Sequence, residues 1–132
     1  MGVSLKADSS KIELAVHGLI TPALAGVCDF VKAGSRNPKE NPSKQVYCNA
    51  TVPIVDLSAI SQTTIRIEIY VEQTKGFKNS TTLSQIRDII IPLIADGVTI
   101  DNSYFVALTS ELCRPDGNGF DFIFLNLAVT IT

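Results

Sequence analysis

The chain has 132 residues, of which 45% are hydrophobic and 18% are charged, so it is long enough for one domain with a core and too apolar for intrinsic disorder. Its formal net charge of −2 argues against the overall basic character of proteins that bind nucleic acid tightly. No run of about 18 or more apolar residues could span a bilayer, and the first residues lack the apolar core of a signal peptide. We therefore expect a protein that is made in the cytoplasm and has no membrane contact.

The first predicted element is an amphipathic helix over residues 10–31. Its apolar residues recur at helical spacing and form one stripe: Ile12, Val16, Leu19, Ile20, Ala23, Val27, Phe30 and Val31. Ser10 and Glu13 have the spacing of a capping box, which predicts that the helix begins there. Pro22 removes one backbone hydrogen bond from a helix, so we expect a kink or a break into two short helices.

A long polar loop is predicted over residues 33–45, which are rich in Pro, Asn, Ser and charge and have no apolar periodicity. Loops of this length are uncommon in small domains and often have a function. Arg36, Lys39 and Lys44 are therefore candidates for contact with a partner. The alternative is a solvated connector.

Two strands are expected after this loop. The first begins at Val46, and because Pro53 soon interrupts the pattern we expect an edge strand. The second alternates clearly from Thr63. One face carries Ile65, Ile67, Ile69 and Val71, and the other carries Arg66, Glu68, Tyr70 and Glu72. A half-polar strand of this kind is typical of an antiparallel sheet.

A second amphipathic helix follows. Its buried stripe is predicted to consist of Leu83, Ile86, Ile89, Ile90, Leu93 and Ile94. Thr82 and Gln85 have capping-box spacing at its start, and Gly97 suits the left-handed position after its end. Pro92 lies inside the pattern, so a kinked or irregular last turn is expected.

Residues 103–113 and 119–131 are predicted to form a hairpin, because Pro-Asp-Gly and Asn-Gly pairs between them favour a tight reversal. The last strand has two apolar faces. Ile123, Leu125, Leu127, Val129 and Ile131 lie on one face, and Phe120, Phe122 and Phe124 lie at the start of the other. A layer of helices covers only one face, so the aromatic face needs a second layer or another subunit. These three phenylalanines, with Tyr70, Arg114 and the edge strand at Val46, form a candidate subunit or partner interface.

Few residues are suited to catalysis. His17 is the single histidine, which leaves almost no material for a Ser-His-Asp triad or a multi-histidine metal site. Glu111, Asp116 and Asp121 flank a Gly-rich turn, where carboxylates more often shape the turn than act as general acids. We expect no enzymatic activity, no cofactor and no metal.

The three cysteines are widely spaced and form no Cys-x-x-Cys pair, which is the usual signature of a metal or redox site. We expect Cys28, Cys48 and Cys113 to be small buried side chains in a reducing compartment.

The order of the elements resembles that of the tail terminator and tail completion proteins of tailed bacteriophages. The segments that carry the resemblance are IRIEIYVEQ, the helix TTLSQIRDIIIPLI, and the hairpin YFVALTSELCRPDGNGFDFIFLNLAVTI. The resemblance implies a small antiparallel sheet packed with helices, and a subunit of a ring at the head-to-tail junction with a lumen that conducts DNA. It transfers no individual site residue.

The predicted fold is a single α+β domain over residues 1–132, with an antiparallel sheet of about four or five strands and two helices packed on one face. The predicted function is that of a non-enzymatic structural protein of the virion tail or neck, assembled in the host cytoplasm. Its expected partners are copies of itself in a hexameric or dodecameric ring, adjacent portal, connector or tail proteins, and DNA that passes through without tight binding. The alternatives are a small-ligand-binding or enzymatic domain, whose pocket is lined by Tyr70, Phe120 and Phe122, and an adhesin-like module.

Overall fold

A computed structural model of the chain describes residues 8–27, 29–33, 46–51, 62–73, 75–115, 117 and 119–131, with the backbone alone for 29–33 and 46–51. The elements, in chain order, are helix α1 (Ser9–Ile20), the short 3₁₀ helix η1 (Thr21–Leu24), strands β1 (Asp29–Ala33), β2 (Val46–Thr51) and β3 (Gln62–Glu72), helix α2 (Ser80–Ile94), and strands β4 (Val98–Ile100), β5 (Tyr104–Pro115) and β6 (Phe120–Ile131). The predicted loop at 33–45 lies almost entirely outside the described residues.

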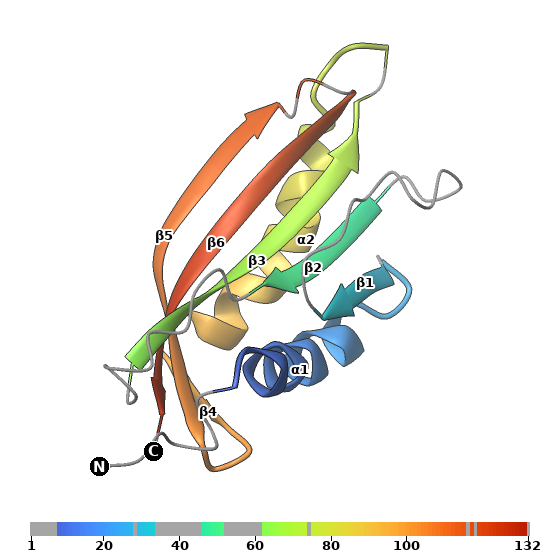
Figure 1. The fold of residues 1–132 in the computed structure, drawn as a ribbon. Helices are drawn as coiled ribbons and strands as arrows, with labels where there is room; N and C mark the ends of the chain where they lie inside the picture. Colours follow the sequence, from blue (N-terminus) through green and yellow to red (C-terminus); the bar gives the residue numbers. More distant parts are fainter. Residues whose placement is uncertain are drawn as a thin grey trace.

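One six-stranded sheet organises the chain, with the strands in the order β1-β2-β3-β6-β5-β4 (Figure 1). Across the sheet, the neighbouring strands β2, β3, β6, β5 and β4 are all paired antiparallel, and the edge strand β1 pairs parallel with β2. Buried residues of α1 and α2 belong to the same cluster as one face of β3 and β6, so both helices pack on that face. The predicted α+β fold, with an antiparallel sheet and two helices on one face, is confirmed.

The core forms where the period-two pattern of the strands meets the helical stripes. Its fully buried side chains on the strands include Ile65, Ile67, Ile69, Leu125, Leu127 and Val129, and on the helices Ile12, Val16, Ile20, Leu83, Ile86, Ile90 and Ile94. The inward faces predicted for β3 and β6 are therefore correct. Because each such side chain contributes about 1.5–3 kcal/mol when removed from water, this interface between sheet and helices is the main source of stability.

The first helix is shorter than the sequence predicts. A break at Pro22 occurs as expected, since α1 ends at Ile20 and Pro22 lies in the first turn of η1. The prediction of helix up to Val31 is wrong, because residues 29–33 form strand β1. Gly26, with a positive φ of 80°, lies between η1 and β1, and such a backbone conformation cannot continue a right-handed helix.

Both predicted capping boxes are wrong, and each N-cap lies earlier in the chain, although α1 begins at Ser9, within one residue of the predicted start. The Asp8 carboxylate accepts hydrogen bonds from the backbone N–H groups of Ser10 (2.9 Å) and Lys11 (3.2 Å). The Asn79 side-chain oxygen accepts one from the Thr82 N–H (3.4 Å). Asp and Asn satisfy the free N–H groups of the first turn, so no capping box at Ser10 or Thr82 is needed.

The end of α2 and the hairpin agree more closely with the sequence. Gly97 follows α2 at a positive φ of 85°, as predicted, and α2 continues through Pro92 to Ile94. The hairpin of β5 and β6 is confirmed. The expectation that β2 is an edge strand is wrong, because β1 pairs with its outer side.

Candidate interaction surface

The candidate surface lies on the face of β3 and β6 that points away from the core. Strand pairing places Tyr70 opposite Phe122, Glu68 opposite Phe124, and Arg66 opposite Asn126. Residues directly opposite in an antiparallel pair lie on the same face of the sheet, so one surface collects side chains from segments about 55 residues apart in sequence. Helix α2 lies behind this part of the sheet in Figure 1.

Three aromatic rings on this face form one cluster, which we call the aromatic cluster: Tyr70, Phe122 and Phe124. Phe122 and Phe124 stack with ring centroids 4.2 Å apart, and the Tyr70 ring lies 5.8 Å from Phe122 and 6.3 Å from Phe124. The two Tyr70 separations are within the range in which aromatic pairs attract, by about 0.5–1.5 kcal/mol per pair, and the Phe122–Phe124 separation lies just below the lower limit of that range. The three side chains are half-buried, so part of each ring remains at the surface.

Arg66 extends the aromatic cluster at one side. Its guanidinium carbon lies 4.6 Å from the centroid of the Phe124 ring, and its Nε donates a hydrogen bond to Asn126 Oδ1 at 3.3 Å. A cation over an aromatic ring at this distance contributes about 0.5–1 kcal/mol at an exposed site. The surface therefore combines an apolar centre with an oriented positive charge.

The structure brings together most of the residues proposed for an interface. Phe120 lies at the end of the same face, opposite Glu72, and Arg114 of β5 is exposed opposite Phe122. The contacts of Arg66 with Phe124 and Asn126 were not predicted from the sequence. Arg66 has the same strand parity as Tyr70, and this signal was sufficient to place it on this face.

The other proposed interface residues are not placed on this surface. Arg36, Lys39 and Lys44 lie outside the described residues. Val46 begins β2, and its backbone pairs with Val71, a core residue of β3.

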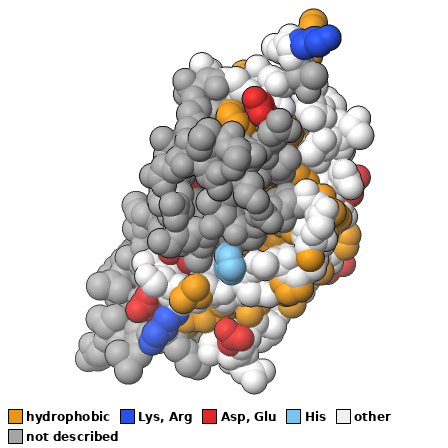
Figure 2. All heavy atoms as spheres, turned by 90° about the vertical axis from the view of Figure 1, so that its right-hand side faces the viewer, with side chains coloured by type: hydrophobic (Ala, Val, Ile, Leu, Met, Phe, Trp, Pro, Cys, Tyr) orange, Lys and Arg blue, Asp and Glu red, His pale blue; other side chains and the backbone are white. Residues whose placement is uncertain are grey.

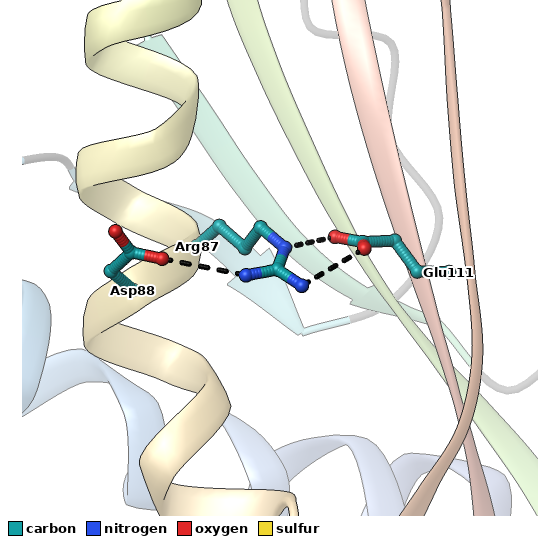
Figure 3. Close-up of polar contacts among 3 residues, drawn as sticks. All are labelled: Arg87, Asp88 and Glu111. Carbon is teal, nitrogen blue, oxygen red and sulfur yellow. Dashed lines mark hydrogen bonds and ion pairs between the residues drawn. The ribbon is translucent and has the colours of Figure 1, made fainter.

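Two of the three carboxylates near the hairpin, Glu111 and Asp121, lie in its strands and not in its turn. Asp121 lies within β6, is only 4% exposed, and accepts a hydrogen bond from Gln73 Nε2 at 3.2 Å. Glu111 lies in β5, where its carboxylate accepts from Arg87 Nε (2.5 Å) and from a second guanidinium nitrogen (3.1 Å), while Asp88 bonds the same guanidinium at 3.4 Å (Figure 3). The prediction that these two residues are turn formers is wrong, and Asp116 lies outside the described residues.

The remaining reactive side chains form no metal-binding group in the described part of the chain. The His17 ring lies 3.4 Å from the Thr21 hydroxyl. No three His, Cys, Asp or Glu side chains are grouped to hold a metal ion among the described residues. Cys113 is a free, exposed thiol, so the prediction that it is buried is wrong. Cys28 lies outside the described residues, and only the backbone is described at Cys48.

No helix within the described ranges has the length and apolar character needed to cross a membrane. No protein-family model matches the chain, and no curated protein is significantly similar to it. Function must therefore be argued from the geometry of the aromatic cluster and from the order of the elements.

Proposed function

We propose that this chain is a structural virion protein whose copies form a closed ring around the DNA channel, in the tail or at the head-to-tail junction of a bacteriophage. The observation that carries the proposal is the aromatic cluster on the face of the sheet opposite to the one on which α1 and α2 pack. The order of strand, helix and terminal hairpin supports the same assignment, because it resembles the tail terminator and tail completion proteins.

The composition of this surface suits a subunit contact. Aromatic residues and Arg are enriched at protein interfaces, and a few such residues near the centre supply most of the binding energy. Phe122 and Phe124 provide apolar area, Tyr70 adds a polar group at its ring edge, and Arg66 is held in one orientation by Asn126. A neighbouring copy that covers this face would bury the part of each ring that is exposed in the single chain.

The charge of the chain fits a channel through which DNA moves. A subunit with a net charge of −2 has no overall excess of positive charge, and tight binding to phosphates would slow the passage of DNA. In this proposal the ring guides DNA and contacts adjacent portal, connector or tail proteins, and it catalyses no reaction.

Light scattering after size-exclusion chromatography, over a series of concentrations, tests the proposal together with negative-stain images. We expect the wild-type chain to form a ring of six or more copies. Phe122→Ser should shift the mass toward single chains, because it removes a stacked ring from the aromatic cluster. Leu14→Ser is the matched control, since Leu14 is an exposed residue of α1 and lies on the other side of the sheet.

The outcomes separate the parts of the proposal. A ring that forms equally well from Phe122→Ser would show that the aromatic cluster is not the subunit contact. A single monomeric species at every concentration, without rings in the images, would contradict the ring and favour the alternative of a ligand-binding domain. Circular dichroism of each variant establishes that the change in mass does not come from unfolding.

A further inference from the structure

The loop between β3 and α2 presents the most exposed large hydrophobic side chain among the described residues. Phe77 is 77% exposed and lies between the exposed Lys75 and Lys78. We call residues 75–78 the 75–78 tip. The loop projects from the upper end of the sheet in Figure 1, and a hydrophobic side chain lies beside a basic one at the projecting tip in Figure 2. A projecting aromatic residue flanked by two cations is an interaction surface by composition.

Described contacts at Gln73 and at Asn79 lie on either side of the 75–78 tip. Before it, the Gln73 N–H donates to the Gly119 carbonyl at 2.8 Å, which ties the loop to the β5–β6 turn. After it, Asn79 caps α2. Lys75 and Gly76 reverse the chain with positive φ angles of 53° and 79°. Phe77 is therefore exposed in a segment that lies between two anchored residues, Gln73 and Asn79.

The opposite end of the molecule has the complementary chemistry. The register places the end of β3 beside Phe120, whereas Tyr104 and the β4–β5 turn lie beside Ile131 at the other end of β6. Phe105 is 40% exposed there, with its ring so close to Gly97 that a Cβ added to the glycine would lie 2.3 Å from the ring. We call this surface, which comprises Asp96, Asp101 and Phe105, the β4–β5 end.

Two exposed carboxylates lie at the β4–β5 end. Asp96 and Asp101 are exposed and belong to the turns on either side of β4. The pKa of Tyr104 is raised, first by burial and then by the negative charges of Asp8 and Asp101. The 75–78 tip carries Lys75 and Lys78, so the charged residues that define the two patches are opposite in sign, and each patch has an exposed aromatic ring.

We infer that the 75–78 tip of one copy docks against the β4–β5 end of a second copy, with Phe77 on Phe105 and the two lysines facing Asp96 and Asp101. Because the two patches lie at opposite ends of the sheet, this contact is head-to-tail and repeats from copy to copy. The inference rests on the proposed self-assembly and adds a contact that is separate from the aromatic cluster. The complementary charge favours a second copy of this acidic chain over other partners.

An exchange of charge between two variants tests the contact. The first variant, Lys75→Asp with Lys78→Glu, has an acidic tip and an acidic β4–β5 end, and Asp tolerates the positive φ at position 75. The second variant, Asp96→Lys with Asp101→Asn, has a basic tip and a β4–β5 end without acidic charge, and Asn tolerates the positive φ of 54° at position 101. Each variant alone should associate at least about tenfold more weakly than the wild type in sedimentation velocity, because like charges meet.

Mixing the two variants should restore association, since the acidic tip of the first then meets the basic end of the second. Phe77→Ser in the wild-type background should weaken association without changing any charge. Asp88→Lys is the control for added charge, because Asp88 is exposed on α2 away from both ends, and it should leave the mass unchanged.

The results that would overturn the contact differ from those that would overturn the ring. If both variants form the same ring as the wild type, the head-to-tail contact is wrong and the ring stands. If the mixture stays as dispersed as each variant alone, the charges do not pair in this way. If the wild type binds phosphatidylserine vesicles and the first variant alone loses that binding, the partner of the 75–78 tip is a membrane. If the wild type is monomeric throughout, both proposals fail.

Discussion

Gly97 shows how a single backbone angle and a neighbouring ring determine which side chain is tolerated. Its φ of 85° is strained for any residue with a Cβ, and the added atom would lie 2.3 Å from the Phe105 ring. The ring is 40% exposed and can move aside, so the backbone accounts for most of the cost. We expect Gly97→Ala to lower the free energy of unfolding by about 1–2 kcal/mol, measured by urea denaturation.

Gly18 provides the control for this substitution. It lies within α1, and no atom is within 4 Å of the position that an added Cβ would occupy. Gly18→Ala should therefore raise the free energy of unfolding by about 0.5–1 kcal/mol, because Ala loses less backbone entropy in a helix. Replacement of glycine by alanine is thus expected to lower the free energy of unfolding at position 97 and to raise it at position 18. A change in the same direction at both positions would contradict the interpretation.

Tyr104 should make stability depend on pH in the alkaline range. Burial, and then the charges of Asp8 and Asp101, raise its pKa in the folded state above the ordinary value of 10.0. The folded state therefore holds the phenol proton more tightly than the unfolded state does. The stability that the neutral Tyr104 phenol contributes is fully present below pH 10 and is lost as pH rises through the folded-state pKa.

The measurement is the free energy of unfolding of wild type and Tyr104→Phe at several values of pH around and above 10. Lysine deprotonation affects both proteins alike, so the difference between them reports Tyr104. We expect the wild type to lose stability more steeply with pH than Tyr104→Phe. Parallel curves would show that the Tyr104 hydroxyl titrates in the same way when folded and unfolded.

At the scale of the elements, the pairing of Arg87 with Glu111 connects α2 to the outer half of β5. All residues from Thr109 to Pro115 are exposed, so this part of the strand depends on its ladder with β6 and on this ion pair. The two side chains are 38% and 32% exposed, and water screens the attraction. A double-mutant cycle with Arg87→Ala and Glu111→Ala should therefore give a coupling energy below about 1 kcal/mol.

The local effect of Arg87→Ala should exceed its global effect. Amide hydrogen exchange within residues 110–114 should become faster, whereas exchange in the buried centre of β6 should not change, because only the outer half of β5 loses a tether. Uniform acceleration across the sheet would indicate that the ion pair stabilises the whole fold.

The elements that the sequence predicts well are those whose pattern is local. The alternation in β3 and β6 is sufficient to identify both strands and their buried faces, because period two is a property of one strand alone. Residues 29–33 show where prediction from a local pattern fails. Phe30 and Val31 continue a helical spacing, but Gly26 breaks the helix and pairing with β2 then selects a strand. That pairing depends on residues far away in sequence and leaves no local signal.

The residues of the candidate surface were also predictable from local patterns, but their neighbours across the sheet were not. Parity along β3 and β6 placed Tyr70, Phe122 and Phe124 on one face, and the structure adds their register and ring contacts. The order of the strands supplies what sequence alone lacks, because it decides that β3 and β6 are neighbours. Phe77 was not singled out from the sequence, since exposure of a residue in a turn depends on what packs against it.

For the whole molecule, the aromatic cluster and the two charged ends predict two contacts with different responses to salt. The aromatic cluster acts mainly through apolar area, which salt does not screen. The contact between the 75–78 tip and the β4–β5 end depends on exposed charges, and the screening length falls from about 10 Å at 0.1 M salt to about 3 Å at 1 M. Light scattering of the wild type from 0.05 to 1 M sodium chloride should therefore show partial loss of association, smaller than that caused by Lys75→Asp with Lys78→Glu, because salt only screens the attraction whereas the variant brings like charges together. Phe122→Ser should keep the same salt dependence at lower total mass, because it leaves both charged ends intact. If salt has no effect on the wild type, the charged ends contribute nothing to assembly and the aromatic cluster must account for all of it.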